Sequence, residues 1–479
     1  MSGGIYYAPT EVERRVYAAI RYITAFQHCG VVQEEREHAM ELLQGNIKKL
    51  YFKYLSAAFG SALISSIYGV VDMAMVGQYQ GPDGTAALAV VAPVWNIIYS
   101  LGLLMGIGGA VLFSTERGKQ KKQDEANVYF TAAVIGAAIL AVISWIGVAA
   151  FDRPLLLLFG AEETLLPLAQ TYLLPIKFTA PFFLLNQMLA AFLRNDNAPG
   201  LATRAVLAGG IFNIFGDYYF VFVMDMGIFG AGLATAVGAG ITFVMILSHF
   251  FSKKNTLRLV RPSHLAGKLR QIGVNGFAAF FIDVAMGILT MLFNRQIMKY
   301  AGKDALAVYG IIVNISTFVQ CCAYSVGQAA QPMISVNFGA GKWGRIRETL
   351  KYALLTAAFF SLAWTAAAMA VPNGFVRIFM EPTEAVLDIA PKIIRTYGLS
   401  FLLLPLNIFS TYYFQSMMKP RISFLVSILR GVVISGCFIY ILPVLAGGQA
   451  MWLAMPFTEL IVAVLVIACM KRYTKKSEA

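Results

Sequence analysis

The sequence predicts an all-α integral membrane protein with about twelve transmembrane helices, arranged as two pseudo-symmetric six-helix lobes around a central cavity. Three observations predict this fold: the composition, the length of the apolar runs, and a pattern that recurs in the two halves. Of the 479 residues, 58% are hydrophobic and only 13% are charged. A soluble globular chain carries about twice that charged share, so most of this chain is suited to lipid rather than water.

The apolar residues form runs long enough to cross a hydrocarbon core of about 30 Å. Only helix bundles and closed barrels pair every backbone polar group inside such a core, and these runs are too long for barrel strands. A helix bundle is therefore expected. The expected spans cover about 52–76, 86–112, 126–150, 167–193, 199–223, 227–250, 270–298, 305–335, 351–371, 393–417, 422–445 and 449–470.

The basic residues of the chain fall mostly in every second loop, and the formal net charge is +13. One side of the membrane receives Arg117–Lys122, Arg194, Lys253–Arg270, Lys342–Lys351, Lys419 with Arg421, and Lys471–Lys476. The positive-inside rule predicts that this side is the cytoplasm, so both termini are cytoplasmic and the protein is a multi-pass plasma-membrane protein. The basic excess is thus topological, which argues against a nucleic-acid partner.

The predicted organisation has five segments. An N-terminal cytoplasmic extension (1–47) precedes the N-lobe (48–252, spans 1–6), and a cytoplasmic linker (253–268) leads to the C-lobe (269–470, spans 7–12) and a cytoplasmic tail (471–479). The residues before Met40 lack a signal-peptide pattern. They are interpreted either as a cytoplasmic helix or as a mis-assigned upstream extension with Met40 as the true start, and we favour the second interpretation.

An internal repeat relates the two halves. The segment AALAVVAPVWNI (Ala86–Ile97) resembles DALAVYGIIVNI (Asp304–Ile315), and Asn96 falls on Asn314. Six spans in each half preserve orientation, which predicts parallel repeats about an axis along the membrane normal. Further along, Asn186 and Asn407 occupy nearly matching repeat positions, where we expect them to bond one helix to another.

Ionisable residues at membrane depth are costly and are candidates for function. In the first half, Tyr68 and Asp72 are four residues apart, as are Asn213 and Asp217, so each pair shares a helix face. Thr235 adds a hydroxyl at comparable depth. If these helices meet, their oxygen atoms surround one spot that suits Na⁺ or a shared proton. The alternative is that each acid only caps or pairs locally.

The second half contains a second set of buried charged residues: Asp283, Arg430 and Glu459. One hypothesis is a C-lobe ion site. The other is that Arg430 pairs with Glu459 or Asp283 in a structural ion pair. No spacing of cysteines and histidines indicates a metal site, so we expect no cofactor beyond a coupling Na⁺ or H⁺.

Five motifs resemble those of the multidrug and toxic compound extrusion (MATE) family, which lies in a wider group that includes polysaccharide and lipid-linked oligosaccharide flippases. They are GVVDMAMVG, FNIFGDYYF, GAGLATAVG, IGVNGFAAFFID and WLAMPFTE, and the likeness extends over about residues 48–470. The resemblance implies that Asp72, Asn213, Asp217 and Thr235, with Tyr68 nearby, form the family's N-lobe ion site. It matches Asp283 to the family's alternative acid in span 7. The family's span-10 carboxylate has no counterpart in LLLPLNIFSTYYF, which favours the N-lobe site.

The expected function is secondary active multidrug efflux, with cationic and aromatic small molecules exported by Na⁺ or H⁺ antiport through alternating access. A flippase for a lipid-linked oligosaccharide or polysaccharide is the alternative, although it would want a more basic cavity. A membrane-embedded transferase is disfavoured because no nucleophile–base pair stands out, so we expect no enzyme. ATP is not an expected partner, because FGAGKW (Phe338–Trp343) lacks the upstream glycine and the hydroxyl residue of a P-loop.

Overall fold

The chain is helical in nearly all of its described part. The computed structural model describes residues 41–119, 124–380 and 383–475, and within these ranges there is no β-strand. Twelve helices in the described part are long and apolar enough to cross a membrane. The fold class predicted from the apolar runs is confirmed, because each run closes its own backbone hydrogen bonds as lipid requires. The segment preceding Met40 lies outside the described residues.

The first six spans come from five helical runs. The long helix α2 supplies two of them, because the chain turns at Gly81 (φ 66°), a left-handed conformation that glycine adopts without strain. A short helix, α4 (Asp152–Leu158), connects the third and fourth spans. The runs are α2 (Ile47–Gly118), α3 (Asp124–Ala150), α5 (Leu166–Asn195), α6 (Pro199–Tyr218) with η1 (Tyr219–Val223), and α7 (Gly227–Leu247) with η2 (Ser248–Phe251).

The second six spans follow the same plan, with the short helix α11 (Pro372–Phe379) after the third of them. They are α8 (Leu265–Tyr300), α9 (Gly302–Gly339), α10 (Trp343–Ala370), α12 (Glu384–Gly398) continued by η3 (Leu399–Leu402) and α13 (Leu404–Ser416), α14 (Pro420–Ile428) continued by η4 (Leu429–Val433) and α15 (Ile434–Ala446), and η5 (Gly448–Leu453) followed by α16 (Ala454–Lys475).

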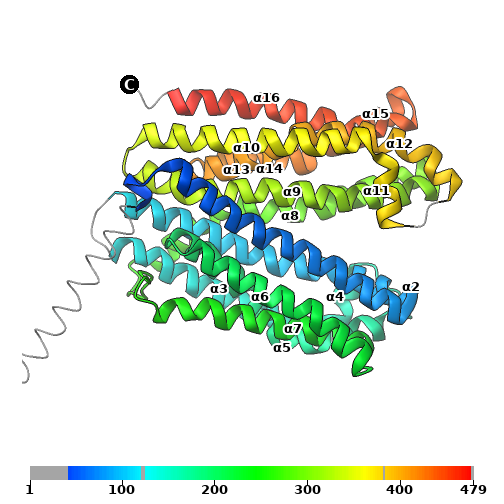
Figure 1. Cartoon of the computed structure of the whole chain (residues 1–479), viewed down its shortest axis with the longest axis horizontal. Coiled ribbons are helices and arrows are strands. Elements are labelled where there is room, and N and C mark those ends of the chain that lie inside the picture. The colour runs from blue at the N-terminus through cyan, green and yellow to red at the C-terminus, as the bar shows by residue number, and fades with distance from the viewer. Residues whose placement is uncertain (1–40, 120–123, 381–382, 476–479) are drawn as a thin grey trace, which may run out of the picture.

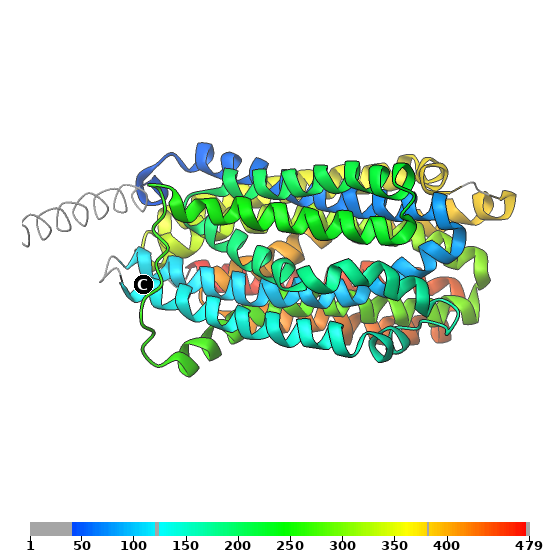
Figure 2. The ribbon, with the colours of Figure 1, turned by 90° about the horizontal axis from the view of Figure 1, so that it is seen from below.

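The two groups of spans lie side by side as two lobes, α2–α7 below and α8–α16 above in Figure 1. In the turned view of Figure 2 the helices of both lobes run along the same long axis. The start of α2 and the end of α16 lie at one end of the bundle, together with the loops that carry most of the basic residues. We call this the basic end and the other the far end. The residue bounds predicted for the lobes, linker and tail stay predictions.

The lobes pack tightly against each other in the half nearest the basic end. One hydrophobic cluster contains Tyr51 and Tyr54 of the first lobe together with Met333 and Ile346 of the second. The backbones of the lobes also touch. A Cβ atom added to Gly276 of α8 would lie 2.0 Å from the carbonyl oxygen of Leu104 in α2, so only a glycine permits this approach.

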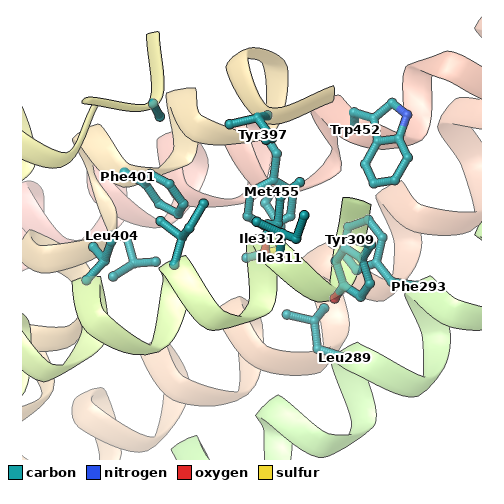
Figure 3. Close-up of a cluster of buried hydrophobic side chains, with 14 of the residues drawn as sticks. Leu289, Phe293, Tyr309, Ile311, Ile312, Tyr397, Phe401, Leu404, Trp452 and Met455 are labelled. Atoms are coloured by element: carbon teal, nitrogen blue, oxygen red, sulfur yellow. The ribbon is translucent and has the colours of Figure 1, made fainter. Parts of the chain in front are cut away.

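The lobes have separate cores in the half nearest the far end. One cluster draws all its residues from the first lobe, among them Val76, Leu156 and Ile228. In the second lobe, Phe293, Tyr309 and Trp452 stack together (Figure 3), with 4.9 Å between the ring centroids of Phe293 and Tyr309. The lobes are therefore joined at the basic end. Leu103, Ile107 and Val111 of α2 also belong to the cluster that contains Phe293 and Trp452, whereas the far-end cluster of the first lobe contains no described residue of the second.

Candidate cation site in the first lobe

Two aspartates are buried inside the first lobe at membrane depth. The side chain of Asp72, on the first span of α2, accepts a hydrogen bond at Oδ2 from the hydroxyl of Tyr172 on α5, at 2.7 Å. Asp217 lies in the last turn of α6, immediately before the π-helical turn η1. Only 7% of Asp72 and none of Asp217 is exposed. Each carboxylate interacts electrostatically with the other, which places both at one spot.

An amide and a hydroxyl complete this spot. The side-chain amide nitrogen of Asn213 donates to Oγ1 of Thr235 at 3.1 Å, and it lies 3.5 Å from Oδ1 of Asp217. The structure thus brings Asp72, Asn213, Asp217 and Thr235 together at one spot, and their role as an ion site stays a prediction. Tyr68 lies one turn before Asp72 and lines the adjoining cavity.

Three oxygen atoms at this spot are buried without a hydrogen-bond donor. They are Oδ1 of Asp72, Oδ1 of Asn213 and Oδ2 of Asp217. Buried acceptors are nearly always satisfied in folded proteins, because an unsatisfied one costs about 1–3 kcal/mol and a charged one more. Oxygen atoms are also the ligands that hard cations prefer. This donor set fits a bound cation or a shared proton, whose charge would offset that of the two carboxylates.

A cavity of about 50 Å³ reaches this spot from within the lobe. Water occupies polar cavities larger than about 10–15 Å³, so water can stand beside Asn213 and Thr235, which line the cavity. The cavity therefore gives a cation or proton a hydrated position next to the amide and hydroxyl of this site. Its polar lining comes from four helices and consists of Ser65, Tyr68, Asn186, Gln187, Asn213, Thr235 and Thr242.

Tyr172 is the member of this site that sequence reasoning missed. It lies on α5 in the apolar segment QTYLLPIK, one hundred positions from its partner Asp72. A tyrosine in an apolar run is usually a packing residue whose hydroxyl finds whatever partner is near. The only signal was its place on a span between two prolines, and that signal is too weak to assign a partner.

Two of the three charged residues predicted for the second lobe form an ion pair. Arg430 Nε donates to Oε1 of Glu459 at 2.7 Å, and both side chains are buried. Asn407 donates to the other carboxylate oxygen of Glu459 at 2.6 Å. The pairing of Arg430 with Glu459 is one of the two that the ion-pair hypothesis named, and Asp283 takes no part in it. The hypothesis of a C-lobe ion site stays a prediction.

Asp283 lies instead at the junction of the two lobes. Its Oδ2 accepts from Ser100 of α2 at 2.9 Å, and its Oδ1 accepts from Tyr324 of α9 at 3.2 Å. The Ser100 hydroxyl has a second acceptor, the carbonyl oxygen of Asn96 at 2.5 Å, so its one proton is shared between them. Asp283 therefore links α8 to the opposite lobe. Asp72, in contrast, lies inside its own lobe.

The amides predicted to bond helix to helix do so in both lobes. Asn186 Nδ2 donates to the carbonyl oxygen of Ala239, and Asn407 Nδ2 donates to that of Glu459. In each lobe the bond joins the fourth span to the sixth. Each lobe therefore has an equivalent internal hydrogen bond between its fourth and sixth spans.

A family model named MatE matches the chain twice, over residues 57–219 and 278–441. These matches cover more than half of the chain and one falls in each lobe. The chain belongs to the MatE family. Members of this family are transporters, so the chain is a transporter and not an enzyme.

Several relatives and solved structures are similar to this MatE chain. The multidrug export protein MepA of Staphylococcus aureus (strain MRSA252) is 25% identical over 376 residues, which cover 78% of this chain and 82% of MepA. MepA of Staphylococcus saprophyticus is 26% identical over 377 residues, with the same shares.

Two solved structures share the fold. One is described as an outward-facing conformation of a multidrug resistance MATE family transporter, with a TM-score of 0.83 and 20% identity over 92% of this chain and 98% of that one. The other is a superfamily member from Pyrococcus furiosus, described as having a binding pocket of reverse polarity, with a TM-score of 0.85 and 20% identity over 92% and 99%.

The two family matches fall one in each lobe, as the internal repeat does. The second match begins 221 residues after the first (57 to 278), and the same offset separates Asn186 from Asn407, whereas Asn96 and Asn314 are 218 residues apart. The repeats therefore differ slightly in length between these positions.

Proposed function

We propose that this MatE protein is a secondary active multidrug efflux transporter that exports cationic and aromatic small molecules in exchange for Na⁺ or H⁺. The observation that carries the proposal is the set of three buried, donor-free oxygen atoms on Asp72, Asn213 and Asp217. The names of the relatives, multidrug export proteins, support the choice of cargo.

The orientation we propose places the basic end in the cytoplasm of a plasma-membrane protein. The positive-inside rule supports it, since the basic loops gather at one end of the bundle. In that orientation the lobes are packed on the cytoplasmic side and hold separate cores on the outer side. This arrangement corresponds to an outward-facing state.

Polar side chains at membrane depth indicate where the cargo passes. Asn96 and Tyr99 of α2 are exposed, as are Asn314 and Thr317 of α9. The α2 residues neighbour Ser100, which contacts Asp283 of the other lobe. Exposed amides and hydroxyls in a span avoid lipid, so they face an aqueous space between the lobes. Neutral polar groups and tyrosine rings suit aromatic cargo that carries a positive charge.

Antiport then follows because the binding of the cation and the binding of the cargo favour opposite states of the protein. An external cation binds at Asp72 and Asp217 in the outward-facing state and neutralises them. The loaded protein turns to the cytoplasm, where it releases the cation and accepts the cargo. Binding drives this change only to the extent that each ligand prefers one state over the other.

The test measures export of a fluorescent cationic dye from proteoliposomes, with Na⁺ and H⁺ gradients imposed separately. We expect gradient-driven export by the unmodified protein, and a loss of at least about tenfold in Asp217→Asn, because the amide lacks the charge that holds the cation. The gradient that supports export identifies the coupling ion. Asp225→Asn is the matched control, since Asp225 is an exposed aspartate beyond the same helix.

Two results would overturn the proposal. Export that survives in Asp217→Asn would remove the first-lobe site from the mechanism. Absence of dye export under both gradients, with the protein monodisperse and folded, would exclude cationic drug antiport and favour translocation of a lipid-linked oligosaccharide.

A further inference from the structure

Arg194 is a buried arginine without a partner of opposite charge. It lies in the last turn of α5, at the basic end, where the charge pattern predicted a loop residue facing water. Instead only 7% of it is exposed. Among the described residues no hydrogen bond or ion pair satisfies its guanidinium group, and the acid nearest in sequence, Asp196, is bound by Arg117 and His249.

The surroundings of Arg194 place it at the junction of the two lobes. Its electrostatic neighbours are Tyr99 on α2 and Tyr412 on α13, one from each lobe. Both tyrosines also interact with Asp283, which bridges the lobes through Ser100. Tyr99 is exposed, whereas Tyr412 is buried. Arg194 therefore lies near one tyrosine from each lobe, at the junction of the two lobes.

The interface beyond Arg194 toward the basic end is closed. Asn195 and Gln331 exchange two hydrogen bonds across the lobes, each of 3.0 Å, between their side-chain amides. The oxygen of Asn195 accepts a further bond from Ser114 at 2.6 Å. A Cβ atom on Gly339 would lie 2.0 Å from the carbonyl oxygen of Thr115. Arg194 precedes Asn195 in the chain and interacts with Tyr99, so it lies between that tyrosine and these buried contacts at the basic end.

A charge in this position has a physical consequence. Arginine stays protonated in proteins, and a buried charge without a partner of opposite charge is costly. In membrane channels a fixed arginine excludes protons and cations by raising the electrostatic barrier along the pore. A paired arginine could not do this, because a carboxylate would cancel its field.

We propose that Arg194 is an electrostatic barrier that prevents cations from leaking between the lobes while the protein faces outward. The inference rests on the proposed function for its direction, because an antiporter loses its driving gradient if the coupling cation crosses without cargo. The barrier requires the charge of Arg194 and its lack of a partner. Asp72 and Asp217 bind the coupling cation, whereas Arg194 keeps that cation from taking the direct path.

The experiment measures passive ion flux without any cargo, so its result does not depend on whether the proposed cargo is correct. Proteoliposomes carry an internal pH dye, and a potassium gradient with valinomycin imposes a membrane potential. We expect Arg194→Gln to raise the proton leak about thirtyfold, equivalent to about 2 kcal/mol. Arg194→Lys keeps the charge and restores a low leak.

Two further variants separate charge from structure. Gln328→Glu introduces a carboxylate beside Tyr412, which hydrogen-bonds Gln328, and it should raise the leak while Arg194 is intact. Arg204→Gln removes an exposed arginine at the same end and should leave the leak unchanged. A leak in folded Arg194→Gln and Gln328→Glu that equals the unmodified protein's would overturn the barrier. So would selective loss of anionic cargo in Arg194→Gln at normal leak, which would make Arg194 a binding residue.

Discussion

The ion pair between Arg430 and Glu459 provides the sharpest test of which buried charges maintain the fold. Its side chains are 8% and 0% exposed, and Arg430 Nε lies 2.7 Å from Glu459 Oε1. Asn407 donates to the second carboxylate oxygen. Glu459→Gln keeps the shape of the side chain at position 459 but removes its charge. The guanidinium of Arg430 is then buried without a partner of opposite charge.

We expect this change to destabilise the protein strongly. Breaking a buried pair by removing one partner costs about 3–5 kcal/mol. For a cooperative unit of roughly 200 residues, about the size of one lobe, each kcal/mol lowers Tm by about 2–4 °C. The lower bound of about 3 kcal/mol therefore corresponds to roughly 6–12 °C.

The assay is thermal unfolding of purified protein in one detergent, followed by intrinsic fluorescence or by loss of the monodisperse peak. Glu163→Gln is the matched control, because it breaks the exposed pair between Arg153 and Glu163, and exposed pairs contribute only about 0–1 kcal/mol. The double variant Arg430→Met/Glu459→Met should recover much of the loss, since it removes both charges together.

The reasoning is refuted if Glu459→Gln leaves Tm within about 1 °C of the unmodified protein and yet abolishes gradient-driven export. That result would mean that Glu459 exchanges its partner during transport, and that the pair belongs to the mechanism rather than to the fold.

Two more changes test the state of the lobes and the cation site. Gly276→Ala places a methyl group 2.0 Å from a backbone carbonyl of α2. Overpacking costs about 1–3 kcal/mol, so the population should shift at least about fivefold toward lobes separated at the basic end. Distances between one spin label on each lobe measure the shift, and Gly273→Ala, which meets no atom within 4 Å, should leave them unchanged. Tyr172→Phe removes the 2.7 Å hydrogen bond to Asp72, worth about 1.5–3 kcal/mol for a charged acceptor. Without this hydrogen bond the cation-free state of Asp72 is less stable, which favours the cation-bound state. The half-saturating concentration of coupling ion should therefore fall about tenfold, and an unchanged or higher value would contradict the role of Tyr172.

The sequence by itself determined the spans, the duplication and the first-lobe acids. Long apolar runs force helices, because lipid offers the backbone no other hydrogen-bond partner. The four-residue spacing of Asn213 and Asp217 placed both on one face of α6, and the structure keeps that face beside Thr235. Local periodicity carries this information, so no tertiary contact was needed to find it.

Tertiary structure decided everything that depends on which helices meet. Tyr172 could not be found, because its partner Asp72 lies one hundred residues away. The apolar runs place Asp283 and Arg430 at similar depth in the membrane. In the structure Asp283 bridges the lobes, whereas Arg430 pairs with Glu459. In the sequence Arg194 resembles the other basic loop residues, but in the structure it is buried. Charge and hydropathy fix the depth of a residue in the membrane, but the rotation and packing of each helix fix its partners.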